Sequence, residues 1–201
     1  MTKLFVGAHP DDVELGCGGT IARNGFYSSA AIFTLCGTNS GLSFLDIEIK
    51  KELYDSMKVL GVENRIYIQN YENTRLYQHA EAIRHDLENI KKDLKPDEVY
   101  IPSLNSIHQD HLVVAMEAIR AFRGRETIYS YEVLSEKIFV PNVFMDITNT
   151  IDRKVEAIQC YKTQGIRPYM DEEIWRGLAR VYGVKSGVRY AEAFELIRKF
   201  V

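Results

Sequence analysis

The chain has 201 residues, of which 46% are hydrophobic and 26% are charged, as in an ordinary globular protein with a sizeable core. We expect one domain over residues 1–201, since no repeat or linker-like tract interrupts it. A net charge of −3 without a basic run argues against nucleic acid as a partner. No apolar stretch approaches the ~18 residues of a membrane span and no signal peptide is evident, so a cytoplasmic location is expected.

Short apolar runs alternate with segments of helical periodicity along the chain. Strands are expected over 4–8, 30–35, 65–68, 99–101 and 127–131. Helices are expected over 49–60, 78–94, 112–122 and 151–158, where apolar residues recur at steps of three and four. The segment 188–200 fits either a further strand or the start of a helix. This alternation predicts β-α-β units and an α/β, Rossmann-like three-layer sandwich with a mainly parallel sheet.

A polar cluster, Ala8-His9-Pro10-Asp11-Asp12-Val13-Glu14, follows the first expected strand and precedes several glycines. One imidazole and two adjacent carboxylates at the end of a buried strand are costly unless a metal ion or a substrate engages them. The alternative is that the two aspartates cap a helix and stabilise its positive end.

A second cluster, His108-Gln109-Asp110-His111, follows the expected strand 99–101. The carboxyl ends of parallel strands meet at one edge of a sheet, so the two clusters are expected to converge. His9, Asp12 and His111 would then give a catalytic zinc two nitrogens and one oxygen, with a position left for water. Zn²⁺ is the expected metal, and Fe²⁺ is the alternative.

The remaining polar residues of the clusters fit catalytic roles. Asp11 stays free beside Asp12 and is placed to act as a general base. His108 lies three residues before His111, so both face one side of a helix start. As an imidazolium it would stabilise an oxyanion or protonate a leaving amine, with Asp110 holding it by a hydrogen bond.

Other polar residues are weaker candidates. Arg75 follows the third expected strand and is either a substrate-binding arginine or an ordinary surface residue. Asn39 and Ser40 follow the second strand and are similar candidates. The three cysteines show no C-x-x-C spacing and are expected to be free thiols, with a metal role as the minor alternative for the first; they are Cys17, Cys36 and Cys160.

The first cluster and its continuation Leu15-Gly16-Cys17-Gly18-Gly19-Thr20, with His108–His111 later, resemble the LmbE-like (PIG-L type) N-deacetylases. The resemblance extends over nearly the whole chain. It implies a zinc-dependent hydrolase that removes acetyl groups from N-acetylglucosamine units of small glycoconjugates. By motif position it implies metal ligands at His9, Asp12 and His111, a base at Asp11, an electrostatic or acid partner at His108 oriented by Asp110, and a supporting role for Glu14.

Three other functions fit part of the pattern. A metal hydrolase of another amide or ester would use the same residues. A nucleotide-binding module would use Gly16-Cys17-Gly18-Gly19, but this segment lacks the G-x-G-x-x-G spacing and follows acidic residues. A metal-binding protein without catalysis would leave Asp11 and His108 without a role. The expected partner is a small N-acetyl sugar, and a homo-oligomer is compatible with the sequence.

Overall fold

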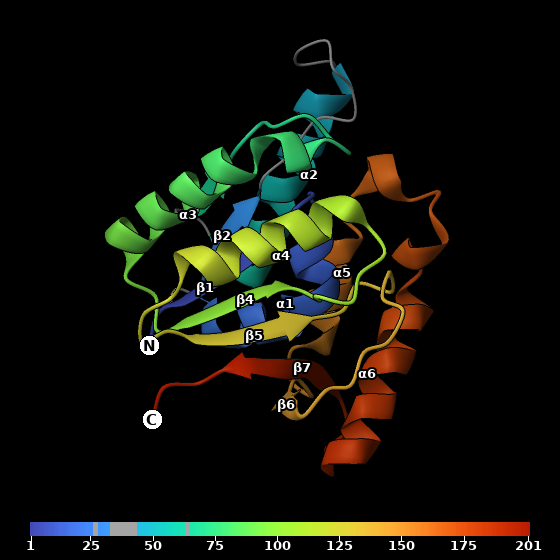
Figure 1. Ribbon diagram of the computed structural model, residues 1–201. Coiled ribbons are helices and arrows are strands. Elements are labelled where there is room, and N and C mark those ends of the chain that lie inside the picture. Colours follow the sequence, from blue (N-terminus) through green and yellow to red (C-terminus); the bar gives the residue numbers. More distant parts are fainter. Residues whose placement is uncertain (26–27, 33–43, 63–64) are drawn as a thin grey trace.

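A seven-stranded sheet forms the centre of the protein in the computed structural model, which describes residues 1–25, 28–32, 44–62 and 65–201 (Figure 1). Within these residues the strand order is β3-β2-β1-β4-β5-β7-β6. The strands are β1 Lys3–Gly7, β2 Ser28–Ile32, β3 Ile66–Ile68, β4 Glu98–Pro102, β5 Thr127–Tyr131, β6 Val143–Asp146 and β7 Ala191–Arg198. Three residues considered above, Cys36, Asn39 and Ser40, lie outside the described ranges.

The first five strands of the sheet run parallel. β1 lies between β2 and β4, with β3 beyond β2 and β5 beyond β4. β7 runs antiparallel to both β5 and β6. The segment 188–200, which fitted a strand or a helix start, therefore contributes an antiparallel strand. The expected α/β fold with a mainly parallel sheet is confirmed.

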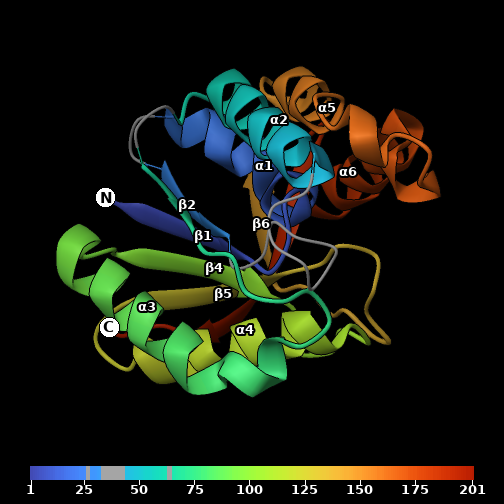
Figure 2. The same cartoon turned by 90° about the horizontal axis from the view of Figure 1, so that it is seen from above.

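Helices cover both faces of this sheet (Figure 2). α1, α2, α5 and α6 lie on one face, and α3 and α4 lie on the other. The helices are α1 Asp12–Asn24, α2 Phe44–Leu60, α3 Ala80–Leu94, α4 Gln109–Ala121, α5 Ile151–Ile158 and α6 Glu172–Ser186. The four expected helices correspond to α2, α3, α4 and α5, whereas α1 and α6 were not expected.

The central strand β1 is buried on both faces, which explains its continuous apolar sequence. Successive side chains of a strand point to opposite faces. Phe5 faces α1 and stacks on Tyr100 of β4 with ring centroids 4.5 Å apart. Leu4 and Val6 belong to the second core, beneath α3 and α4. The end of β1 is thereby fixed between two packed layers.

The glycines after the first cluster lie inside helix α1 and allow it to pack closely. A Cβ atom on Gly19 would stand 2.7 Å from Ile147, and one on Gly18 would stand 2.9 Å from Lys154. A Cβ atom on Gly16 would overlap the ring of Tyr131. These glycines therefore serve helix packing, and the segment is not a loop that cradles phosphate.

Candidate active site

The two polar clusters meet at the carboxyl ends of the neighbouring strands β1 and β4. The chain builds the sheet outward in one direction from β1 to β3 and in the other from β4 to β5. Ligands of parallel sheets usually bind at such a switch point between two strands. The ring of His9 lies 4.7 Å from that of His108 and 5.2 Å from that of His111, measured between centroids. The expected convergence of residues about a hundred positions apart is thus present in the structure.

Asp12 is the first residue of α1, and its carboxylate turns back toward the end of β1. Oδ2 accepts hydrogen bonds from the backbone N–H groups of Ala8 and His9, both at 2.9 Å. Oδ1 lies 3.3 Å from Nε2 of His111, and Oδ2 lies 3.5 Å from Nδ1 of His9. The backbone thereby fixes a carboxylate between two imidazole nitrogens.

Three groups that could bind a metal therefore form a tight triangle, called the ligand triangle below: Nδ1 of His9, the carboxylate of Asp12 and Nε2 of His111. The two nitrogens are 3.3 Å apart, and each lies 3.3–3.5 Å from an Asp12 oxygen. Ligand atoms bound at ~2.0–2.1 Å to a tetrahedral zinc stand roughly 3.3–3.4 Å apart. The residues present thus fit a zinc-like ion.

A second, overlapping set of three possible ligands consists of His9, His108 and His111. One nitrogen from each lies within 4.8 Å of the others. Both sets contain His9 and His111, so only the third ligand differs. Among the described residues, His9, His108 and His111 are a group of histidine, cysteine or acidic side chains close enough together to hold a metal ion.

The outer nitrogens of both shared histidines have hydrogen-bond partners. Nε2 of His9 lies 3.2 Å from Oδ2 of Asp110 and 3.1 Å from Oδ1 of Asn73. Nδ1 of His111 lies 3.1 Å from the hydroxyl of Ser106 and 3.2 Å from that of Ser135. Such partners fix the ring orientation and the tautomer of metal-binding histidines, and leave the inner nitrogens free to bind the ion.

The charges around His9 also favour a cation at this point. Burial alone would lower the pKa of His9, but hydrogen bonds to Asp110 and Asp12 outweigh it and raise the pKa to about 10. Burial alone would raise the pKa of Asp12, but the charge and hydrogen bonds of His111 and His9 hold it well below its usual range. The cluster therefore stabilises positive charge, which a metal ion supplies.

Asp11 is the residue before α1 and has a backbone conformation that is unusual for a side-chain-bearing residue. Its φ angle is 92°, and its carboxylate forms no helix-capping hydrogen bond. Such strain is found where the surrounding structure holds a residue for function. Burial and the neighbouring charge of Asp12 raise the pKa of Asp11 well above its ordinary value. The side chain thus lies beside the ligand triangle with its oxygens unused by the helix.

His108 stands at the start of α4 and presents one nitrogen to the site. Its Nδ1 accepts a hydrogen bond from the backbone N–H of Asp110 at 3.2 Å, so Nε2 carries the proton of the neutral ring. Burial and the positive charges of His9 and His111 lower the pKa of His108 to about 4. These contacts favour a neutral N–H donor at His108 over the expected imidazolium.

The carboxylate of Asp110 is bound differently from the expectation. It contacts Nε2 of His9 and accepts backbone N–H groups from Thr74 at 2.7 Å and Leu76 at 3.3 Å. Sequence analysis paired it with His108, which it reaches only through its own backbone N–H. The helix start turns the Asp110 side chain toward the loop after β3, so it orients His9.

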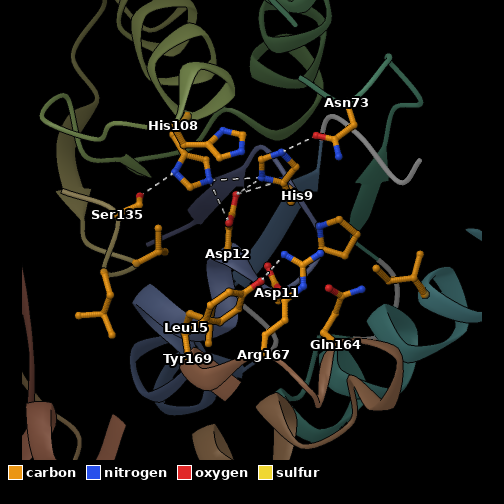
Figure 3. A pocket seen from close by; sticks show the side chains of 15 residues that line it. His9, Asp11, Asp12, Leu15, Asn73, His108, Ser135, Gln164, Arg167 and Tyr169 are labelled. Carbon is orange, nitrogen blue, oxygen red and sulfur yellow. Dashed lines mark hydrogen bonds and ion pairs between the residues drawn. The ribbon is translucent and has the colours of Figure 1, made fainter. Parts of the chain in front are cut away.

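These groups line a cavity of about 300 Å³ (Figure 3). His9, His108 and Asp12 lie on one side of it, and Arg167, Tyr169 and Gln164 lie on the other, with Asp11 between them. The size suits a small ligand. A buried carboxylate, a cluster of possible metal ligands and an N–H donor therefore face one cavity.

A match to a protein-family model identifies the family to which the chain belongs. The model described as GlcNAc-PI de-N-acetylase (PIG-L) matches residues 4–122, which is more than half of the chain. The chain belongs to the PIG-L family. The resemblance to LmbE-like deacetylases is thereby confirmed, and membership makes the chain a deacetylase and a hydrolase. The family is metal-dependent, in agreement with the ligand cluster.

Individual proteins resemble the chain over most of its length. The uncharacterized deacetylase YaiS of Escherichia coli is 35% identical over 72% of this chain and 80% of its own. The N,N′-diacetylchitobiose deacetylase from Pyrococcus horikoshii is 28% identical, with a TM-score of 0.82 over 98% of this chain and 83% of its own. The conserved protein TT1542 from Thermus thermophilus is 27% identical, with a TM-score of 0.85 over 100% of this chain and 96% of its own.

No described helix of this PIG-L family member is long and apolar enough to span a membrane.

Two further residues considered in the sequence, Glu14 and Cys17, lie away from the proposed metal ligands. Glu14 is buried in α1 and accepts hydrogen bonds from Ser56 at 2.8 Å and Tyr161 at 2.6 Å, and burial raises its pKa to about 7. It connects α1 to α2 and to the segment after α5. Cys17 is buried in the core and does not line the cavity.

Arg75 does not face the cavity of this family member. Its Nε pairs with Glu72 at 2.8 Å on the surface, and Arg167 lines the cavity instead. Sequence reasoning missed Arg167, Tyr169, Asn73 and Ser135, because they lie in loops or 3₁₀ turns without apolar periodicity. The order of elements alone does not reveal which loop returns to the site.

Proposed function

We propose that this deacetylase is a metal-dependent enzyme that removes the N-acetyl group from a small glycoconjugate containing N-acetylglucosamine. The observation that carries the proposal is the carboxylate of Asp11, which makes no helix-capping hydrogen bond and belongs to a residue with a φ of 92°, next to the triangle of His9, Asp12 and His111. We propose these three as the ligands and zinc as the metal, with ferrous iron as the alternative. A bound metal of this kind acidifies a coordinated water and polarises an acyl oxygen.

The residues of the chain have separate tasks in this reaction. Asp11 removes a proton from the attacking water, and the water oxygen bonds to the acetyl carbon. The neutral Nε2–H of His108 donates to the acyl oxygen, where negative charge develops. Asp11 then returns the proton to the nitrogen, the carbon–nitrogen bond breaks, and acetate and a free amine result. Asp110 and Ser135 keep the two ligand imidazoles oriented.

The substrate class rests on the family and on the cavity. The P. horikoshii relative is named for an N-acetylated disaccharide, and a cavity of about 300 Å³ accommodates one sugar with a small substituent. Other amides and esters would meet the same reacting groups. The substrate therefore has to be chosen by the parts of the cavity beyond the ligands.

Acetate release from a panel of N-acetylglucosaminides, with and without a chelator, tests the proposal. We expect release from at least one member, abolished by the chelator and restored by Zn²⁺ or Fe²⁺. Turnover of simple acetate esters or peptides without any release from the N-acetyl sugars would reject this substrate class. Undiminished release after complete metal removal would reject the metal-dependent mechanism.

A further inference from the structure

The only Lys or Arg side chain among the described residues that line the active-site cavity is Arg167. It stands between the 3₁₀ turns Lys162–Gln164 and Pro168–Met170, in the segment that connects α5 to α6. Its backbone N–H bonds to the carbonyl of Gln164 and its carbonyl accepts from Met170, both at 2.9 Å. Arg167 is itself exposed to solvent, and its side chain points into the site (Figure 3).

The guanidinium of Arg167 is held by an aromatic residue, and no described carboxylate forms an ion pair with it. Nη1 donates to the hydroxyl of Tyr169 at 3.1 Å, and the cation lies 5.9 Å from the centre of the Tyr169 ring. Some other arginines of the described structure have carboxylate partners, as Arg75 has with Glu72, whereas others, such as Arg153, donate to backbone carbonyls. A guanidinium has five N–H donors, so most of those of Arg167 remain available.

The surrounding charges leave room for an anion on this side of the cavity. Asp12 lies on the opposite side of the cavity and Asp11 lies between Asp12 and Arg167, and a divalent ion at the triangle with Asp12 would offset these negative charges. Besides Asp11, the neutral side chains of Gln164 and Tyr169 line the cavity on the side of Arg167. A neutral sugar would not use the full charge of Arg167, whereas a carboxylate or a phosphate matches its planar fork.

We infer that Arg167, held by Tyr169, forms a subsite for an anionic substituent, a carboxylate or a phosphate, carried by the sugar substrate. The inference rests on the proposed deacetylation and narrows its substrate to acidic N-acetylglucosaminides. Arg167 is a binding and specificity residue in this scheme and does not touch the acetyl group. Arg167 also lies beside Asp11, which gives an alternative role. In that role the charge of Arg167 would act on the proposed base Asp11 and change the turnover of every substrate equally.

Kinetics with three substrates separate these roles. The substrates are methyl N-acetylglucosaminide, its carboxymethyl counterpart and N-acetylglucosamine 1-phosphate. For the wild-type protein we expect kcat/KM for at least one anionic substrate to exceed that for the methyl glycoside about tenfold or more. Arg167→Gln should bring this ratio close to one, mainly through KM of the anionic substrate. Arg167→Lys should keep part of the preference for phosphate.

Arg75→Gln is the matched control, because it removes an arginine from the same edge of the protein but outside the cavity. It should leave the ratio unchanged. A wild-type ratio near one, or an equal loss of kcat on all three substrates in Arg167→Gln, would overturn the subsite. Release of acetate from the methyl glycoside in such a case would still support the proposed deacetylation.

A binding measurement keeps the inference testable if no substrate is turned over. Calorimetric titration of the metal-loaded protein with glucosamine 1-phosphate and with glucosamine compares an amino sugar with and without the anionic substituent. We expect the phosphate to bind at least tenfold more tightly to the wild-type protein and this difference to disappear in Arg167→Gln. Equal affinities in the wild-type protein would reject the subsite whatever the reaction is.

Discussion

Oδ2 of Asp110 lies 3.2 Å from Nε2 of His9, on the side of the ring that faces away from Asp12 and His111. The same carboxylate accepts two backbone N–H groups from the loop after β3. This chain of contacts fixes His9 with its Nδ1 toward the ligand triangle. A residue expected to serve His108 thus orients His9, a proposed metal ligand.

Replacing Asp110 by Asn keeps the shape of this contact but removes its charge. We expect metal affinity to fall about 10- to 100-fold, because the partner of a ligating imidazole raises its basicity. Competition with a chromophoric chelator measures the affinity. Asp93→Asn, an exposed residue of α3, is the control and should bind metal like the wild-type protein. Unchanged affinity in Asp110→Asn would contradict this role.

Asp11→Asn tests the proposed base with little disturbance of the backbone. Asn tolerates a positive φ better than most residues, so the conformation at φ 92° should persist. We expect the variant to retain its metal and lose about 10²- to 10⁴-fold in kcat. Elemental analysis and acetate release are measured on the same preparation. Wild-type turnover with full metal content would remove Asp11 from the base role.

The tight packing of α1 can be tested at Gly19. Ala is a better helix former by ~1 kcal/mol, but its Cβ would stand 2.7 Å from the branched side chain of Ile147. We expect Gly19→Ala to lower the free energy of unfolding by about 1–3 kcal/mol. Gly177→Ala in α6, where nothing lies within 4 Å of the new atom, should be neutral or stabilising. Denaturant unfolding compares the two, and equal effects would contradict the packing explanation.

Glu14 makes stability depend on pH in a predictable direction. Both its donors, Ser56 and Tyr161, bond to Oε1, so a Gln in its place can keep both contacts. Burial raises the pKa from 4.5 to about 7, so the native state holds the proton more tightly than the unfolded chain. Wild-type stability therefore falls as the pH rises from about 4.5 through about 7.

Glu14→Gln cannot ionise and should not show that fall. We expect the difference in free energy of unfolding, variant minus wild type, to increase with pH by up to roughly 3 kcal/mol and to become constant above about pH 8. Urea unfolding at a series of pH values gives the difference directly. A difference that is constant across this range would show that Glu14 titrates alike in the folded and unfolded chain.

Much of the fold follows from local sequence, because fully buried parallel strands read as continuous apolar runs. The elements that were missed owe their structure to tertiary packing. α1 contains Gly16, Gly18 and Gly19, which weaken helix propensity but allow close contact with β5 and α5. β6 has four residues, none of them fully buried, so it shows no strong alternation. α6 has Gly177 in its interior and an incomplete apolar stripe.

The candidate site likewise contains residues that the sequence places correctly and residues whose position depends on tertiary packing. The motif residues from His9 to His111 could be brought together from sequence, since parallel strands place their carboxyl ends at one edge. The partner of Asp110 and the charge state of His108 could not, because both depend on side-chain direction and burial. Arg167 could not be found either, since its loop enters the site through the packing of α5 and α6.

Metal content of three variants tests the central claim, a metal held by His9, Asp12 and His111 with His108 as a separate donor. Each protein is stripped with a chelator, reloaded with Zn²⁺, desalted and analysed for zinc per chain. We predict one zinc in the wild-type protein and in His108→Ala, and little or none in Asp12→Ala and His111→Ala. Retention by Asp12→Ala together with loss from His108→Ala would contradict the ligand assignment.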